Sequence, residues 1–190
     1  MSLKNLLFFA FLAFPGLLLA QSFNAELSFG MTGSQIDGDD IAGYNKIGLF
    51  AGGGVGIPLQ KDKLFLRSVI FYAQKGSHST AKDPFYLRWR VSYLEIPLTL
   101  QYMFTKKIYG LGGLGADILL SSKIDTYGFS FSDNSETMKK AVPLIIGGVG
   151  YFLSPKLAFN IRFMYSLLSA GKLEASYTNT IAVYLSYKLK

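Results

Sequence analysis

The sequence contains no cysteine, one histidine and one tryptophan, and only six of its 190 residues are proline. The absence of cysteine excludes a disulfide framework and thiolate chemistry. His78 is the only imidazole that could act in catalysis. Half of the chain is hydrophobic, yet after residue 20 no uninterrupted apolar run approaches the ~20 residues that a membrane-spanning helix requires. A helical membrane protein is therefore disfavoured.

The first 20 residues have the layout of a secretory signal peptide. Lys4 supplies a positive charge, an apolar run extends from Leu6 to Phe14, and Ala20 ends the segment. We therefore expect cleavage after Ala20 and a mature domain over residues 21–190. The alternative is an uncleaved anchor helix, which the short apolar run and Pro15 disfavour.

The stretch Tyr93–Phe104 shows most clearly how the mature chain is built. Every second residue from Leu94 onward is apolar, whereas the intervening positions include Glu95 and Gln101. Successive side chains of a strand point to opposite faces, so the pattern predicts a strand with one apolar and one polar face. Pro97 removes one hydrogen-bond donor from this strand, and we expect a β-bulge there.

Seven further segments carry strand patterns, which makes eight in all. The alternation is weakest in the third and sixth segments, whose facing stays open. The connections between the segments alternate between long and short along the whole chain. The predicted strands are 25–33, 46–58, 63–76, 89–104, 108–122, 140–153, 156–168 and 177–189.

Outer-membrane β-barrels combine an even number of strands with short periplasmic turns and longer external loops. The chain has this arrangement, together with an export signal and abundant glycine and aromatic residues. We therefore predict an all-β fold, an eight-stranded antiparallel up-and-down transmembrane β-barrel in the outer membrane of a Gram-negative bacterium. A soluble periplasmic barrel that binds a lipid inside is the alternative.

The polar faces of the strands would line the interior of this barrel. An eight-stranded barrel is just wide enough for side chains to fill it, so we expect paired charges rather than a pore. Arg67 or Arg162 is the expected partner of Glu95, and the glycines at 52–56 and 110–115 would make room for large neighbours. The predicted interior polar residues are Arg67, Glu95, Gln101, Asp117, Asn160 and Arg162.

Basic residues flank the predicted external loops at Arg88, Arg90, Lys139 and Lys140. Basic clusters bind anionic head groups, so these four residues are candidate contacts to lipopolysaccharide. Ordinary solubility at the rim is the alternative. The net charge of +7 fits an exported protein that meets anionic lipid rather than nucleic acid.

Three patterns in the sequence bear on catalysis, cofactor binding and metal binding. His78 would belong to a hydrolase at the external rim only if a Ser or Asp converged on it; the simpler interpretation is a solvated loop histidine. Gly110–Gly115 has the letters of a dinucleotide fingerprint but continues as a strand. Asp37–Asp40 lacks the spacing of a calcium loop. We therefore expect no enzyme activity, cofactor or metal ion.

Three stretches carry a resemblance to a known family: Tyr72–Gly76, Tyr93–Leu98 and Gly112–Gly115, of which Tyr93–Leu98 (Tyr-Leu-Glu-Ile-Pro-Leu) is the most specific. Through them, essentially the whole mature chain resembles the PorT-type outer-membrane β-barrel family of Bacteroidota. The resemblance implies an eight-stranded barrel, and a barrel match does not transfer the secretion role of the family's namesake. The chain departs from the pattern by ending in Lys190 rather than in the aromatic residue that the insertion machinery reads.

These patterns favour a closed, monomeric barrel with a structural or interaction role through four external loops. Its expected partners are outer-membrane lipid, lipopolysaccharide, the barrel-insertion machinery and an envelope protein. The alternatives are a small-solute channel, an outer-membrane enzyme and a lipid-binding barrel.

Overall fold

The computed structural model describes residues 23–41, 43–173 and 175–189, so the predicted signal peptide at residues 1–20 lies outside the described residues. The regular secondary structure of the described chain is β-strand, apart from one turn of 3-10 helix in the third long loop. The strands are β1 (Asn24–Asp37), β2 (Lys46–Gln60), β3 (Leu64–His78), β4 (Arg88–Met103), β5 (Ile108–Asp125), β6 (Ser132–Asp133), β7 (Ala141–Phe152), β8 (Leu157–Ser166) and β9 (Tyr177–Lys188).

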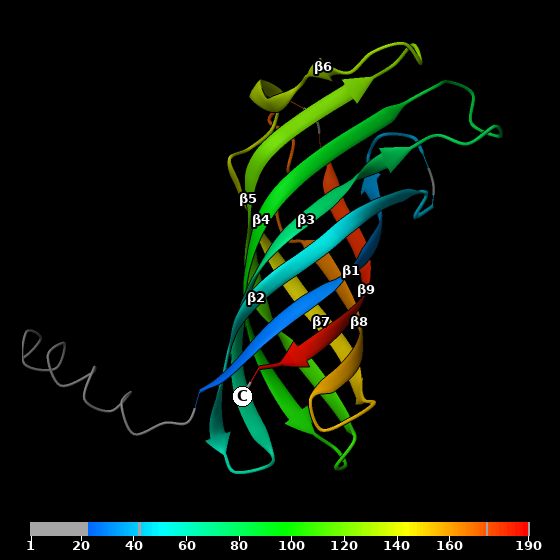
Figure 1. The fold of residues 1–190 in the computed structure, drawn as a ribbon. Coiled ribbons are helices and arrows are strands. Elements are labelled where there is room, and N and C mark those ends of the chain that lie inside the picture. Colours follow the sequence, from blue (N-terminus) through cyan, green and yellow to red (C-terminus); the bar gives the residue numbers. More distant parts are fainter. Residues whose placement is uncertain (1–22, 42, 174, 190) are drawn as a thin grey trace, which may run out of the picture.

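Eight of these strands close into one antiparallel barrel (Figure 1). Neighbours in the barrel follow the chain order, and β9 pairs with β1 to close the sheet. The two-residue strand β6 pairs with the end of β5 and belongs to the long loop between β5 and β7. The predicted closed eight-stranded antiparallel barrel is confirmed. Among the described residues, no helix is long and apolar enough to span a bilayer.

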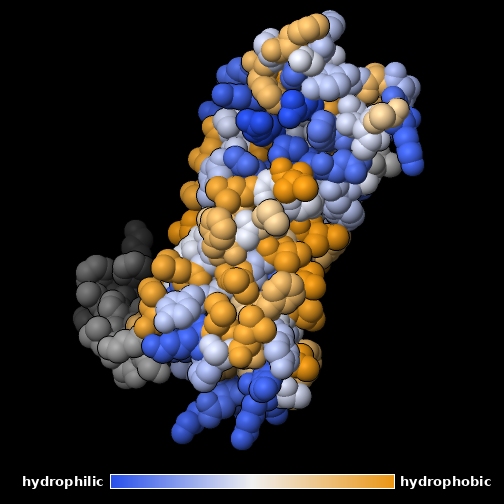
Figure 2. Space-filling view, turned by 45° about the vertical axis from the view of Figure 1, so that its right-hand side comes forward, coloured by the Kyte–Doolittle hydropathy of each residue, from blue (hydrophilic) through white to orange (hydrophobic). Residues whose placement is uncertain are grey.

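The outward faces of the strands are apolar. In β4, Leu98 and Leu100 are about half exposed, whereas Glu95, Thr99 and Gln101 are buried. On the face seen in Figure 2, hydrophobic side chains cover the middle of the barrel, and hydrophilic side chains gather toward both ends. An apolar surface of this extent is suited to lipid, because in water it would expose more apolar area than a soluble domain tolerates.

The structure shows which side chains of β3 and β7 point into the lumen, which the sequence pattern left undecided. In β3, Arg67 and Phe71 are buried while Ile70 between them is exposed. In β7, Leu144 and Ile146 are buried, and Ile145 is exposed. Both strands therefore alternate between lumen and lipid like the others, and the apolar residues of their inner faces hid this alternation in the sequence.

The predicted bulge at Pro97 is wrong. The pairing of β3 with β4 keeps one register from Arg67–Thr99 to Phe71–Glu95, but the three residue pairs between them drop out of the ladder. The register shift in β4 lies between Ser92 and Tyr93 instead. Proline lacks the N–H that would bond to β3, so the ladder opens locally without an inserted residue. Ser68 Oγ donates a hydrogen bond to the Pro97 carbonyl oxygen at 3.2 Å.

Three strands run further toward the long loops than predicted. The sequence pattern ended them at residues 33, 76 and 122, whereas β1, β3 and β5 continue to Asp37, His78 and Asp125. These extensions are mostly polar, and the neighbouring strands supply the ladder partners that hold them. Gly76 has a φ of +135°, and a Cβ there would lie 1.9 Å from the Trp89 carbonyl oxygen, so only glycine fits at this position.

Candidate functional site

The centre of the barrel holds four charged side chains from four strands, which we name the central cluster: Lys75, Glu95, Asp117 and Arg162. Lys75 Nζ donates to Glu95 Oε2 at 3.0 Å and to Asp117 Oδ2 at 2.7 Å. Arg162 forms a salt bridge with the other oxygen of Glu95. Two cations therefore meet two carboxylates, and the formal charges cancel.

Burial makes this pairing obligatory. The side chains of Lys75 and Glu95 are fully buried, and those of Asp117 and Arg162 nearly so. An unpaired charge in such surroundings is strongly unfavourable, so each group depends on its partners. The Arg162 guanidinium also lies over the Phe71 ring, 5.0 Å from its centroid. The cluster ties β3, β4, β5 and β8 together across the lumen.

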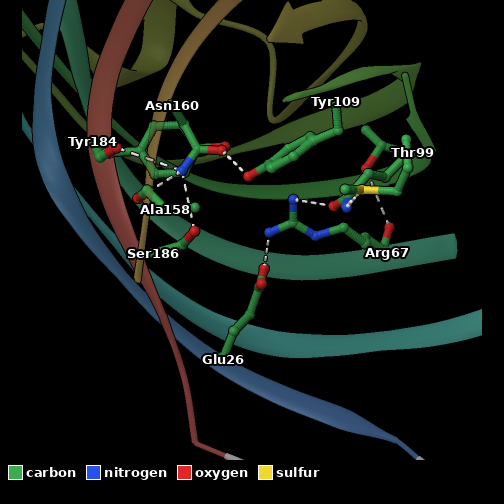
Figure 3. A network of polar contacts seen from close by, with 10 residues as sticks. Glu26, Arg67, Thr99, Tyr109, Ala158, Asn160, Tyr184 and Ser186 are labelled. Atoms are coloured by element: carbon green, nitrogen blue, oxygen red, sulfur yellow. Dashed lines mark hydrogen bonds and ion pairs between the residues drawn. The ribbon is translucent and has the colours of Figure 1, made fainter. Parts of the chain in front are cut away.

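A second group of polar contacts, which we name the lower network, is drawn in Figure 3. It lies nearer the short turns, because Gln101 and Tyr109 are close to the ends of β4 and β5 that one such turn joins. Arg67 forms a salt bridge with Glu26 and donates from Nη1 to Gln101 Oε1 at 2.9 Å. The Tyr109 hydroxyl donates to Asn160 Oδ1 at 2.5 Å, and Asn160 Nδ2 donates to Ser186 Oγ at 3.0 Å. Each of these contacts joins strands that are adjacent or separated by one strand in the barrel. The Arg67 guanidinium also lies over the Tyr109 ring, 6.0 Å from its centroid, so the two sets of contacts meet inside the lumen. The lower network consists of Glu26, Arg67, Gln101, Tyr109, Asn160 and Ser186.

Aromatic side chains fill the space that both groups adjoin. Phe50 and Phe71 stack with ring centroids 4.1 Å apart, and Tyr184 meets Phe71 edge-on at 5.7 Å. A cavity of about 10 Å³ is lined by Arg67, Arg162, Phe71 and Tyr184, among others. The interior at this level is thus occupied by side chains, as the width of an eight-stranded barrel requires.

The external end of the interior is filled by loop residues. Met138, from the loop between β5 and β7, is buried against Trp89, Tyr93 and Val142. Ala170, from the loop between β8 and β9, joins the same cluster. An isolated bridge between Met138 and Gly171 holds the two loops together. The long loops therefore cover the lumen rather than leaving it open.

All six residues predicted to face the lumen are buried, but they form two groups rather than one. Arg162 is a partner of Glu95, whereas Arg67 pairs with Glu26 instead. Sequence reasoning missed Lys75 and Glu26 as members of these groups. Both could have been found from strand phase, because Lys75 has the parity of Arg67 in β3, and Glu26 lies on the polar face of β1.

The four predicted basic rim residues do not form one site. Arg88 and Arg90 both lie over the Phe131 ring, at 5.7 and 4.7 Å from its centroid. Together with Lys46 and His78 they line a cavity of about 270 Å³, which we name the external pocket. Lys139 and Lys140, just before β7, do not line this pocket.

The external pocket gathers like charges at the outer ends of β2, β3 and β4. No carboxylate is among its described lining residues, which are Asn45, Lys46, Ile47, His78, Arg88, Trp89, Arg90 and Phe131. The pKa of His78 is lowered by partial burial and by the positive charges of Arg88 and Lys46. The pocket is therefore an electropositive site to which an anion would be attracted.

This position of His78 bears on the hydrolase alternative. His78 is the last residue of β3 rather than a loop residue, and its ladder partner is Arg88. The described residues that line the external pocket with His78 include no Ser and no Asp. In the same described part of the chain, no group of three or more Asp, Glu or His residues is placed to hold a metal ion.

Comparison with known proteins decides the family. The profile of a family described as "Outer membrane protein beta-barrel domain" matches residues 19–170. The chain belongs to this family. Its members are proteins of the Gram-negative outer membrane, and this location is established for the chain. No curated protein matches the sequence significantly.

Solved structures of outer-membrane proteins share the fold of this family member. Neisserial surface protein A is similar with a TM-score of 0.56 and 9% identity, covering 90% of this chain and 99% of its own. Ail, the attachment invasion locus protein of Yersinia pestis, has a TM-score of 0.53 and 12% identity, covering 88% and 99%. At these identities the likeness concerns the fold alone.

Proposed function

We propose that this outer-membrane barrel is a closed, membrane-anchored binding protein whose external pocket holds phosphate groups of lipopolysaccharide. The observation that carries the proposal is the convergence of Lys46, His78, Arg88 and Arg90 on one cavity whose described lining residues include no carboxylate. Arginine presents a planar fork of donors that suits phosphate oxygens. Phosphates in the outer leaflet would lie at the level of these strand ends.

The filled interior supports an interaction role over transport. The central cluster, the aromatic side chains and the buried Met138 occupy successive levels of the lumen. Binding chemistry is therefore expected at the ends of the barrel, where loops and strand ends meet the environment. The matched proteins are outer-membrane barrel proteins rather than enzymes, which supports a non-catalytic role.

One neighbour in fold binds a related kind of ligand. A crystal structure of Ail is a complex with the heparin analogue sucrose octasulfate, a densely anionic sugar. For this chain we favour lipopolysaccharide over a soluble sulfated glycan, because the pocket lies at strand ends, next to the lipid-facing Ile47. Sucrose octasulfate is then a useful soluble competitor.

The single histidine gives a direct readout of the proposal. In phosphatidylcholine nanodiscs, ¹⁵N-histidine labelling yields side-chain signals from one imidazole, that of His78, because the sequence has one histidine. Bound phosphate offsets the neighbouring positive charges, so we expect lipopolysaccharide to raise the pKa of His78, measured by NMR titration. Loss of the two arginines in Arg88→Gln/Arg90→Gln should weaken binding by about 30-fold, at about 1 kcal/mol for each charge.

The matched control is Lys106→Gln/Lys107→Gln, which removes two charges from the opposite end and should retain the full response. Because Arg88→Gln/Arg90→Gln alters the starting pKa of His78, the change on adding lipopolysaccharide is the quantity to compare. An unchanged His78 signal in the unmodified protein would refute the proposal.

A small-solute channel is the second candidate. Its test is conductance in planar bilayers, for which we expect no discrete channel openings from the unmodified protein. Reproducible openings that depend on protein insertion would contradict the closed lumen and favour the channel.

The narrower assignment to the PorT-type family of Bacteroidota stays a prediction. It is supported by Tyr93–Leu98, whose Glu95 anchors the central cluster, and by Tyr72–Gly76, whose Lys75 binds that glutamate. The monomeric state, the insertion machinery and an envelope protein partner likewise remain expectations.

A further inference from the structure

A second cavity, separate from the external pocket, lies at the barrel end that carries the short turns. It has a volume of about 690 Å³, and we name it the turn-side mouth. In barrels of this type the short turns face the periplasm. A volume of this size lies within the range of about 300–1,000 Å³ that is typical of small-molecule sites.

The wall of the turn-side mouth is apolar. Phe65, Met103 and Phe152 line it, and the last two pack against the buried aromatic core of the barrel. The Phe152 ring lies 5.2 Å from the Tyr109 ring, which fixes its position. The mouth thus offers a preformed surface for a hydrocarbon group.

The rim of the same cavity is cationic. Lys106, Lys107 and Lys188 line it, and Asp62 is the one carboxylate among its described lining residues. Lys188 Nζ lies 4.5 Å from the Phe152 ring centroid, so a positive charge stands directly beside the apolar wall. Figure 2 shows hydrophilic side chains extending from this end of the molecule.

The lower network closes the inner side of the mouth. Gln101 and Lys188 line both the mouth and a narrower cavity of about 20 Å³ that contains Arg67 and Glu26. Arg67 is already paired with Glu26 and Gln101 there. A ligand can therefore enter from the turn side but finds no open path through the barrel.

We propose that the turn-side mouth binds a single-chain anionic amphiphile, of the fatty-acid or lysophospholipid class. Its hydrocarbon chain lies against Phe65, Met103 and Phe152, and its carboxylate or phosphate is bound by the lysines of the rim. The narrowness of an eight-stranded barrel admits one chain rather than two. The inner leaflet, whose head groups lie at the level of this end, is the source of the ligand.

The test uses hexadecanoic acid with a photoreactive diazirine near its methyl end, added to the full protein in phosphatidylcholine nanodiscs. We expect crosslinks on Phe65, Met103 or Phe152, identified by mass spectrometry. Unlabelled hexadecanoic acid should compete, and hexadecanol, which lacks the charge, should not. Crosslinks confined to lipid-facing residues such as Leu98 and Leu100 would overturn the proposal.

Two triple variants distinguish binding at a specific site from general attraction of the anionic ligand to positive charge. Lys106→Gln/Lys107→Gln/Lys188→Gln removes the lining lysines and should reduce specific crosslinking about tenfold or more, as loss of a charge-assisted hydrogen bond does. Its control, Lys61→Gln/Lys63→Gln/Lys156→Gln, removes three lysines from the same end that do not line the cavity, and should leave crosslinking within about twofold. The folded state of each is checked by gel mobility before and after heating.

An equal loss in both triple variants would overturn the proposal, because it would indicate diffuse attraction. Binding of an acidic peptide in place of the fatty acid would also overturn it and would assign the mouth to a protein partner. Neither result depends on the external pocket, so this inference and the proposed function can fail separately.

Discussion

The central cluster and the lower network contain similar ion pairs in different surroundings. Lys75 and Glu95 have fully buried side chains, whereas those of Arg67 and Glu26 retain 8% and 6% exposure and line a small cavity that shares Gln101 and Lys188 with the turn-side mouth. In the central cluster each charge has only protein partners to replace water. The comparison suggests that depth of burial, more than the number of ion pairs, sets the cost of losing a partner.

The two groups also differ in how strongly their members depend on one another. Asp117 is held by the Lys75 ammonium, and Glu95 shares that ammonium while also binding Arg162. Arg67, in contrast, keeps a neutral hydrogen bond to Gln101 if Glu26 is lost. In the central cluster, ion pairs link side chains from four strands. In the lower network, one ion pair is supported by hydrogen bonds to neutral groups.

The largest effect is expected from Lys75→Met. Asp117 loses its salt-bridge partner and Glu95 loses one of two, so two carboxylates face one arginine in a buried site. We expect the free energy of unfolding to fall by about 3–5 kcal/mol, as for other buried pairs that lose one partner. Urea titration of the barrel refolded in lipid bilayers measures the change.

The control for this variant removes the opposite charge as well. Lys75→Met/Asp117→Asn leaves Arg162 and Glu95 as a neutral pair, and should recover a large part of the lost stability. If the double variant is as unstable as Lys75→Met alone, the loss arises from packing rather than from an uncompensated charge.

A smaller effect is expected from Gly150→Ala. A Cβ at this position would lie 2.2 Å from Cζ of Tyr109, so the ring must move away from Asn160. We expect destabilisation of about 1–3 kcal/mol, the usual range for overpacking. Gly147→Ala in the same strand is the matched control, because nothing lies within 4 Å of its Cβ, and it should be neutral or stabilising.

The smallest effect is expected from Glu26→Gln. Arg67 keeps its hydrogen bond to Gln101, and the cavity beside it lies next to the turn-side mouth. A loss of about 1 kcal/mol is expected in the same urea titration. A loss as large as that of Lys75→Met would show that depth of burial does not distinguish the two groups.

Much of the fold follows from local patterns. Alternation in Tyr93–Phe104 and in the segments like it predicts strands, and the alternation of long and short connections predicts a barrel with two unlike ends. Which face of β3 and of β7 points into the lumen is harder to predict from the sequence. Their inner faces carry Phe71, Leu144 and Ile146, which are as apolar as the residues on the lipid side.

The candidate sites were only partly visible in the sequence. Alternation identified six buried polar residues, but which charge meets which depends on strand tilt and side-chain reach across the lumen. The external pocket joins the ends of β2, β3 and β4, and the turn-side mouth joins residues from several turns and strand ends. No single segment contains either site.

The sequence by itself therefore determined that the chain forms an outer-membrane barrel with an apolar outside and a charged inside, because these properties repeat along each strand. Only the tertiary structure decided that Lys75 bridges Glu95 and Asp117 and that Arg67 pairs with Glu26. It also decided that Pro97 opens the ladder without a bulge. The physical reason is that pairing across a closed barrel depends on the geometry of closure, which joins residues far apart in the chain.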